Sequence, residues 1–471
     1  MKIIYVLFGL LMIFLLNACS SSKKMPPVIP QDPIDTVRNN ATISNNDTSS
    51  NNRMVTNKDT VTNNITLTNN IIVKPDLAKT DSFLANLLKK YPRYFDSIIK
   101  YRQEWNVQVI YTQVNRDKNN NPAFTDYYFN VDSSKYFYPA STVKLPTALL
   151  ALQRLNELRS TGISKNSTII TEAAYSGQAA TYNDPQTPDG RPTIESYIKK
   201  IFLVSDNEAF NRLYEFLGQK YINEELHRKG YADAQVLHRL DIFLSEDENR
   251  HTNPVKFLDN SNNILYTQPL VYDKTIYAER QDTLGKAYYS SGNLVNKPMN
   301  FSKKNRLSLE DLHQILRSVI FPGNVPEKQR FNLTDNDYAF VRHYMSQFPG
   351  ESVFPSYDSA NYSDAYAKFL LYGARREPLP KNVRIFNKVG DAYGQLIDIA
   401  YITDLDKNIE FFVSASLNCD SDGILNDDKY DYDTIGFPFM KNLGNVLYDY
   451  ELKRKKAYQP DLSSFKIIYD K

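Results

Sequence analysis

The sequence predicts an α/β fold of the α+β type, with one antiparallel sheet assembled from both ends of the folded region. Stretches of β-rich composition lie near the two ends of residues 81–471, and helical patterns occupy the middle. Strands at both ends with helices between them favour a single sheet that draws on both termini. The chain has 471 residues and 42% hydrophobic residues, which is ample for a packed core.

The elements can be predicted in order from the spacing of apolar residues, beginning near Asp81. The alternating, β-branched and aromatic stretches predict strands, and apolar residues three and four apart predict helices. In chain order the expected elements are helical spacing at 82–103 broken at Pro92, strands at 107–114 and 126–131, a helix at 141–157, two helical stretches at 194–218 meeting near Ser205, an amphipathic helix from about 307, strands at 395–403 and 409–417, and a last helix from about Phe437 to Lys456.

The first 19 residues, MKIIYVLFGLLMIFLLNAC, predict a secretory signal, because one Lys precedes an apolar run that ends at Cys19. The ending Leu16-Asn17-Ala18-Cys19 resembles the lipobox of bacterial lipoproteins, in which the cysteine is lipidated; the alternative is an ordinary signal peptide with an incidental cysteine. Residues 20–80 are rich in Asn, Thr and Ser and predict a disordered tether. We therefore expect a domain lipid-anchored to a membrane in the cell envelope, with the periplasmic face favoured.

Composition argues against several classes of protein. The formal charge of +2 and the lack of a long basic patch give no reason to expect a nucleic-acid partner. With Cys19 lipidated, Cys419 has no disulfide partner and is expected to be a small buried residue. The five histidines show no metal-ligand spacing, so no metal or cofactor is expected, and the absence of G-x-S-x-G disfavours an α/β-hydrolase.

Ser141 and Lys144 stand three residues apart where a polar stretch turns into an apolar helix. One turn of helix would place them on the same face, and a lysine in a partly apolar site can lose its proton near neutral pH and act as a base. The alternative is a lysine that merely extends from a helix end into solvent. The S-x-x-K pattern is weak by itself, because it also begins at Ser20, Ser21, Ser97, Ser196 and Ser463.

Two further motifs follow later in the chain and favour the catalytic interpretation of Ser141 and Lys144. Ser205-Asp206-Asn207 and Lys388-Val389-Gly390 each occur once, and S-x-x-K, S-D-N and K-[TS]-G together form the signature of class A β-lactamases and penicillin-binding proteins. His238 to Asp241 and Asn249 to Pro254 resemble the two ends of that family's omega loop. The resemblance covers residues 81 to about 457. It implies a five-stranded antiparallel sheet built from both termini plus an all-helical subdomain.

The resemblance also implies roles for single residues. Ser141 would be the acylated nucleophile and Lys144 its base or proton relay. Ser205 would pass a proton to the leaving nitrogen, and Asn207 would hold Lys144 and the substrate. The other implied roles are positive charge near the substrate carboxylate from Lys388, close approach of the edge strand to the ligand at Gly390, an oxyanion hole made by the backbone N–H groups of Ser141 and Asp391, and a turn tied by the Asp206 side chain.

The chain departs from the family pattern in three places. Val389 replaces a hydroxyl residue, so one hydrogen bond to a substrate carboxylate is lost. In direct register the deacylating glutamate falls on Leu244, and a substitute, first of all Glu246, would come from the acidic stretch Glu246-Asp247-Glu248, which is otherwise a solvated loop. The region 255–375 is enlarged and contains a Tyr-rich stretch, which is either a packed cap or a surface for glycan or peptide.

Three functions remain open at this point. The first is a serine hydrolase that acts through a Ser141 acyl-enzyme on a β-lactam or a related cell-wall amide. The second is a D,D-peptidase or penicillin-binding protein with slow deacylation, acting on a peptidoglycan-type peptide. The third is a non-catalytic cell-envelope binding lipoprotein on the same fold, against which the intact Ser141, Lys144 and Lys388 argue.

Overall fold

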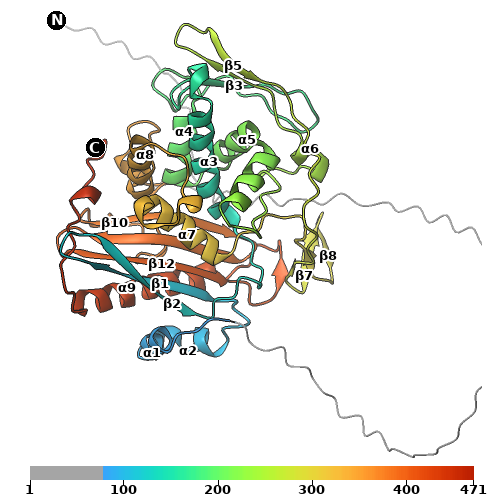
Figure 1. The fold of residues 1–471 in the computed structure, drawn as a ribbon. Coiled ribbons are helices and arrows are strands. Elements are labelled where there is room, and N and C mark those ends of the chain that lie inside the picture. The colour runs from blue at the N-terminus through green and yellow to red at the C-terminus, as the bar shows by residue number, and fades with distance from the viewer. Residues whose placement is uncertain (1–77) are drawn as a thin grey trace, which may run out of the picture.

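The computed structural model describes residues 78–471, so the predicted signal peptide, Cys19 and nearly all of the predicted tether lie outside the described residues. A five-stranded antiparallel sheet in the order β10-β11-β12-β1-β2 forms the centre of the molecule (Figure 1). Because β12 pairs with β1, the sheet joins both ends of the domain, and the predicted fold class is confirmed. Its strands are β1 (Gln108–Arg116), β2 (Pro122–Phe129), β10 (Val383–Ala392), β11 (Gln395–Asp404) and β12 (Ile409–Asn418).

Helices cover both faces of this sheet (Figure 1). Along β1 the side chains of Val109 and Tyr111 enter one hydrophobic core, and those of Ile110 and Val114 enter the other. This alternation follows from the two-residue period of a strand. Burial on both faces explains why the inner strands β11 and β12 consist mainly of apolar residues. One core is closed by α1 (Ser82–Lys89), α2 (Pro92–Lys100) and α9 (Phe437–Lys453), and the other by α7 (Leu309–Ile320) and α8 (Asp335–Ser346).

A helical subdomain packs beside the α7 face and supplies half of the candidate site (Figure 1). Its central helix α3 (Lys144–Glu157) is apolar on nearly all sides, and it packs against both α4 (Ile194–Val204) and α5 (Asn207–Arg228). A short helix, α6 (Glu246–Arg250), follows. The subdomain is not entirely helical, because it also carries a three-stranded sheet formed by β3 (Thr168–Thr171), β4 (Val255–Leu258) and β5 (Ile264–Gln268).

The enlarged region 255–375 contributes further short strands beside the site. These strands are too short to show a clear alternation of apolar and polar residues. The sequence therefore indicated the enlargement but not the strands within it. A further short strand, β13, lies outside this region, after β12, and pairs in parallel with β7, so two distant segments meet there. The strands are β6 (Thr283–Leu284), β7 (Ala287–Ser290), β8 (Asn293–Val295), β9 (Met299–Asn300) and β13 (Ile424–Leu425).

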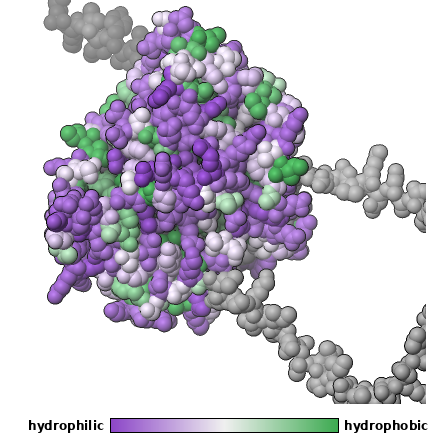
Figure 2. Space-filling model, in the orientation of Figure 1, coloured by the Kyte–Doolittle hydropathy of each residue, from purple (hydrophilic) through white to green (hydrophobic). Residues whose placement is uncertain are grey.

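The face of the molecule seen in Figure 2 is mainly polar, with apolar side chains scattered among charged ones. The most exposed large apolar side chains, Tyr182, Ile264, Ile276 and Ile468, come from separate segments of the chain. Isolated apolar residues of this kind are normal on a protein surface. Among the described residues 78–471, no helix is both long and apolar enough to cross a membrane.

Candidate active site

Ser141 lies in a short 3-10 helix, Ala140–Val143, that leads into α3. The α-helix itself begins at Lys144, so Ser141 lies one turn before the helix predicted to start with it. Ala140 has a left-handed backbone with φ 46°, a conformation that is costly for a residue with a side chain. Such strain marks a turn held by its surroundings, and here it presents the Ser141 hydroxyl to a cleft.

Lys144 is fully buried beneath Ser141 and is surrounded by hydrogen-bond partners. Its Nζ atom lies 2.8 Å from Ser141 Oγ and 2.6 Å from Asn207 Oδ1, and it also contacts the Ser205 carbonyl and hydroxyl. Burial lowers the pKa of Lys144 to about 7, against the opposing influence of nearby carboxylates. A substantial fraction of Lys144 is therefore a neutral amine near pH 7, positioned to accept the Ser141 proton.

Ser205 and Asn207 lie at the junction of α4 and α5, which the S-D-N motif shapes. Ser205 ends α4 in a left-handed conformation, φ 60°, and Asp206 caps α5 by accepting a hydrogen bond from the Ala209 N–H at 2.7 Å. This turn points the Ser205 carbonyl at Lys144. Asp206 thus ties the turn, in agreement with the role expected for it.

Lys388 comes from β10 and reaches the same serine from the sheet side. Its Nζ atom lies 2.8 Å from Ser205 Oγ and 2.8 Å from the Val389 carbonyl, and its side chain is buried. Burial, and next the charge of Lys144, lower the pKa of Lys388 well below its usual value. The two lysines are therefore linked through Ser205, which forms a proton path from one side of the site to the other.

Gly390 is where β10 packs against the turn that carries the nucleophile. A Cβ atom at this position would lie 2.9 Å from the Pro139 carbonyl oxygen and 3.0 Å from the Ser141 nitrogen. The residue is therefore required for close packing of β10 on the Ser141 turn. The close approach to a ligand that the family resemblance implied for Gly390 stays a prediction. Asp391, the next residue on β10, lines the cleft together with Ser141.

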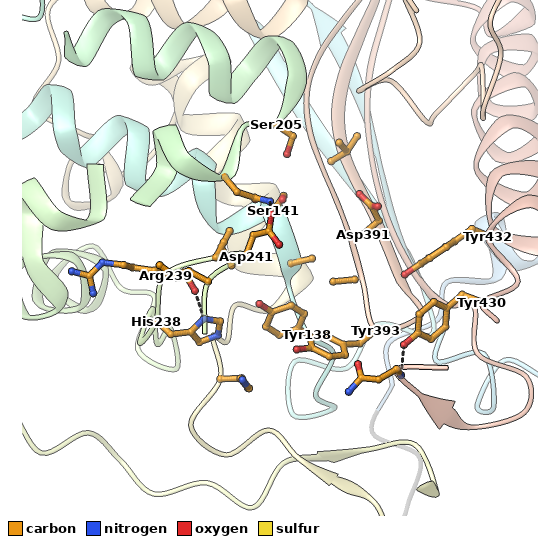
Figure 3. A pocket seen from close by; sticks show the side chains of 18 of the residues that line it. Tyr138, Ser141, Ser205, His238, Arg239, Asp241, Asp391, Tyr393, Tyr430 and Tyr432 are labelled. Atoms are coloured by element: carbon orange, nitrogen blue, oxygen red, sulfur yellow. Dashed lines mark hydrogen bonds between the residues drawn. The ribbon is translucent and has the colours of Figure 1, made fainter. Parts of the chain in front are cut away.

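A carboxylate that the sequence-based reasoning missed, Asp241, also lies in the centre. Its Oδ2 atom accepts a hydrogen bond from Asn207 Nδ2 at 3.2 Å. Asn211 bonds both the N–H and the carbonyl of Leu240, each at 2.8 Å, and so fixes the loop just before Asp241. Figure 3 shows Asp241 turned toward Ser141. The available signal was the Asp of Arg239-Leu240-Asp241, which had been assigned only to the loop end.

The three acidic residues expected to replace the deacylating glutamate make other contacts. Glu246 is half exposed and pairs with Arg250 at 3.0 Å and with Lys303 at 3.7 Å. Asp247 accepts a hydrogen bond from Tyr175, and Glu248 closes a capping box at the start of α6. A hydrogen bond from Ser176 lowers the pKa of Glu248. These residues form the first turn of α6 and not the solvated loop that was the alternative prediction. None of them bonds Ser141 or Lys144 in the described structure.

A cleft of about 1810 Å³ opens above Ser141 (Figure 3). This volume exceeds the roughly 300–1,000 Å³ of common small-molecule pockets. Part of its wall comes from the Tyr-rich stretch of the enlarged region, so that stretch lines the site as well as packing on itself. The lining tyrosines are Tyr138, Tyr277, Tyr362, Tyr366, Tyr393, Tyr430 and Tyr432.

Neither the histidines nor Cys419 supply a further acid, base or nucleophile to the site. His238 lines the cleft, donates or accepts only through Nδ1 at 2.6 Å from the Arg239 carbonyl, and has its pKa lowered to about 3 by burial. Cys419 is a free thiol buried in the core, as expected, and burial raises its pKa. Among residues 78–471, no cluster of three or more His, Cys, Asp or Glu side chains is arranged to hold a metal ion.

Solved structures resemble this chain only at low sequence identity. No curated protein matches this chain. Crystal structures of β-lactamases match at low identity. One is a class A β-lactamase from Clostridium kluyveri DSM 555 (15% identity, 76% of this chain, 98% of that chain, TM-score 0.41), and another is a β-lactamase from Burkholderia phymatum (13% identity, 77% of this chain, 99% of that chain, TM-score 0.42).

The family comparison covers most of the chain. The model described as "Beta-lactamase enzyme family" matches residues 92–422, a span that runs from α2 to β12 and includes Ser141, Ser205 and Lys388. This span is well over half of the 471 residues. The chain belongs to the β-lactamase enzyme family.

Proposed function

We propose that this protein is a serine hydrolase that forms an acyl-enzyme on Ser141. One observation carries the proposal: a fully buried Lys144 whose Nζ lies 2.8 Å from Ser141 Oγ and whose pKa is lowered to about 7. A serine hydroxyl needs an adjacent base to become a nucleophile, and a desolvated lysine is a suitable one. A non-catalytic binding protein has no physical need for this arrangement.

In the acylation half-reaction, the neutral Lys144 amine takes the Ser141 proton while Oγ attacks the substrate carbonyl. The negative charge on the carbonyl oxygen is stabilised by the backbone N–H groups of Ser141 and Asp391, an interaction worth roughly 10²–10³ in rate per donor in a known hydrolase. Ser205, held between Lys144 and Lys388, passes a proton to the leaving group as the bond to the acyl carbon breaks. The product is a Ser141 ester and a neutral leaving group.

In the deacylation half-reaction, Asp241 takes a proton from a water molecule that attacks the carbonyl carbon of the Ser141 ester. The bond between that carbon and Ser141 Oγ then breaks, Oγ regains a proton from Lys144, and the acyl group leaves as a carboxylic acid; Lys144 recovers its proton from Asp241 by exchange with water. The Asp241 carboxylate is held by Asn207, which also bonds Lys144, so the same side chain aligns the groups of both half-reactions. This observation favours hydrolysis over a persistent acyl-enzyme. A penicillin-binding protein with slow deacylation is the second candidate, and the absence of a hydroxyl at Val389 favours it for ordinary β-lactams.

The substrate class proposed is an acyl compound of the β-lactam or cell-wall amide kind. The experiment is intact-protein mass spectrometry after mixing with benzylpenicillin or with a neutral acyl thioester, sampled from seconds to hours, with Ser141→Ala alongside. A transient adduct with turnover supports a hydrolase, and a lasting adduct supports the penicillin-binding alternative. Absence of any Ser141-dependent adduct with both reagents would overturn both candidates in favour of a binding protein.

We also propose that the domain is held at the cell envelope by a lipid on Cys19. The proposal rests on the sequence alone, through the apolar run that ends in Leu16-Asn17-Ala18-Cys19. Metabolic labelling with an alkyne fatty acid tests it: wild type should be labelled and Cys19→Ala should not. Protease accessibility in intact cells then separates the periplasmic face from the outer surface.

A further inference from the structure

The β10 wall of the cleft lacks the features that would hold an anion. Val389 and Asp391 are two residues apart on one strand, so they share a face, and both line the cleft. Val389 offers no side-chain hydrogen-bond donor, and Asp391 presents an exposed carboxyl group to the cleft. Desolvation by the surrounding protein raises the pKa of Asp391, and the charges of Lys388 and Lys144 oppose that rise. A negatively charged substrate group placed on this wall would meet a like charge instead of a hydroxyl.

The opposite wall carries a second exposed carboxylate, Asp241. The hydrogen bond from Asn207 holds the Asp241 side chain. Two hydrogen bonds between Asn211 and Leu240 hold the backbone just before it, so both the side chain and the backbone of this carboxylate are fixed. Figure 3 shows Asp241 and Asp391 on two sides of Ser141. A substrate bound for attack by Ser141 would therefore lie between two carboxylates.

The neighbouring cations lie beneath the serines that line the cleft and are already engaged by protein groups. The Lys144 and Lys388 ammonium groups are buried and are bonded to Ser205, and Lys388 also bonds the Val389 carbonyl. The Arg239 guanidinium is bound to Glu215 within the protein.

The outer segments of the cleft supply its remaining basic side chains. Arg250 and Lys303 both pair with Glu246, at 3.0 and 3.7 Å, and Arg375 lies 3.4 Å from Glu377. Lys304 and Arg376 are the other basic residues of the lining.

The charged groups that act on Lys144 are the carboxylates of Asp206, Asp391 and Asp241, which oppose the lowering of its pKa. Of these, Asp391 and Asp241 line the cleft itself. The cleft surface on both sides of Ser141 thus carries a carboxyl group.

We propose that the substrate carries a positive charge close to the bond that Ser141 attacks, and that Asp391 is the residue that selects it. This inference rests on the acyl-enzyme function proposed above and names its substrate class: acyl esters, thioesters or amides with an ammonium group next to the acyl carbon or on the leaving group. Within the acyl compounds proposed above, those with a free carboxylate, benzylpenicillin included, would react more slowly than neutral or cationic ones.

The test compares three thioesters that share one acyl group and differ in the charge of the thiol; the cationic and neutral ones also match in shape. Phenylacetyl thiocholine is cationic, its carbon isostere with a 3,3-dimethylbutyl thiol is neutral, and the 3-mercaptopropionate thioester is anionic. Release of thiol is followed with a chromogenic disulfide on the full-length protein. A parallel series carries trimethylammonium, tert-butyl and carboxylate groups on the acyl side with one neutral thiol. We expect kcat/KM to fall in the order cation, neutral, anion in at least one series, with about tenfold between cation and isostere.

Asp391→Asn removes the selecting charge and keeps the backbone N–H. We expect it to reduce the cation-to-neutral ratio of kcat/KM by about tenfold, and the ratio is the readout because any effect of the substitution on the shared acylation machinery cancels in it. The matched control is Asp428→Asn, which removes the same charge from another exposed position in the same cleft and should keep the ratio. Raising the ionic strength should also reduce the ratio in wild type, because exposed charges are screened.

The possible outcomes separate this inference from the function on which it rests. Equal kcat/KM for cation and isostere in both series, a preference for the anion, or a ratio unchanged in Asp391→Asn would overturn the charge selection while the hydrolase stands. No Ser141-dependent turnover of any thioester, the neutral isostere included, would instead overturn the proposed function.

Discussion

The buried floor of the site and the loop that overhangs it are built in opposite ways. On the floor, Lys144 and Lys388 are out of contact with solvent and share Ser205 as a partner. In the segment that overhangs it, Asp241 and Glu246 are exposed carboxylates that lie five residues apart in the sequence. Desolvation sets the chemistry of the floor, because it lowers the pKa of both lysines. The two carboxylates differ instead in their partners: Asp241 accepts a hydrogen bond from Asn207, whereas Glu246 accepts one from Arg250.

This difference teaches that the two halves of the proposed reaction depend on different physical effects. Acylation uses a base whose proton affinity is changed by burial, and deacylation uses an ordinary carboxylate held in the right place. Changes to the floor should therefore affect acylation, and changes to the loop should affect deacylation. The predictions below test this separation, beginning with the largest expected effect.

Lys144→Met should abolish acylation, lowering the rate by at least about 10³-fold, because it removes the base that takes the Ser141 proton. Formation of the adduct in mass spectrometry measures this rate. Circular dichroism and thermal unfolding provide the control, since methionine fills a similar buried volume and should leave the fold intact. A variant that folds and acylates within tenfold of wild type would show that Lys144 is not the base.

Asp241→Asn should slow deacylation by about 10²-fold and leave acylation within a few-fold of wild type, so that the adduct accumulates. Asparagine keeps the size of the side chain but cannot accept the water proton. The matched control is Glu246→Gln in the same loop, which should change neither step, because Glu246 is paired with Arg250 and Lys303. The reverse pattern, with accumulation only in Glu246→Gln, would transfer the role to Glu246.

The acylation rate should fall by about tenfold per pH unit below about pH 7. The pKa of Lys144 is lowered to about 7, so the reactive neutral amine is present above this value and is lost as the pH falls through it. A pH profile of adduct formation with a neutral thioester measures this, because the reagent itself does not titrate. A profile that is flat from pH 5 to 9 would contradict the assignment of Lys144.

Asn211→Ala should produce the smallest effect, a slowing of deacylation by a few-fold with acylation unchanged. Asn211 holds both backbone groups of Leu240 and so sets the position of Asp241. Its loss leaves two buried backbone groups without partners, at a cost of about 1–3 kcal/mol of unfolding free energy. Single-turnover kinetics separate the two steps, and denaturant unfolding measures stability. An equal loss of both steps would indicate that loop and floor are not independent.

The fold was largely predictable because burial leaves a periodic trace in the sequence. The stretches at 395–403 and 409–417 match β11 and β12 closely, and the break at Pro92 separates α1 from α2. The start of α3 was placed three residues early, because the 3-10 turn that carries Ser141 has the same residue preferences as a helix end. The two- to four-residue strands of the enlarged region left no readable period.

The candidate site was predictable to the extent that its residues lie in motifs. Ser141, Lys144, Ser205, Asn207 and Lys388, which the three motifs predict, meet in one place, although Ser205 and Lys388 are 183 residues apart. Asp241 was missed and Glu246 favoured, because counting along a loop does not show which carboxylate faces the nucleophile. That depends on Asn207 and Asn211, two side chains on α5.

The sequence by itself determined which chemical groups are present and which stretches are buried: a serine and a lysine three residues apart, a second lysine on a strand, and apolar periods that form one sheet from both ends. Only the tertiary structure decided how these groups behave. The pKa of Lys144 depends on the solvent excluded by distant segments, and the role of Asp241 depends on contacts from another helix. Both are properties of three-dimensional surroundings, which local sequence does not encode.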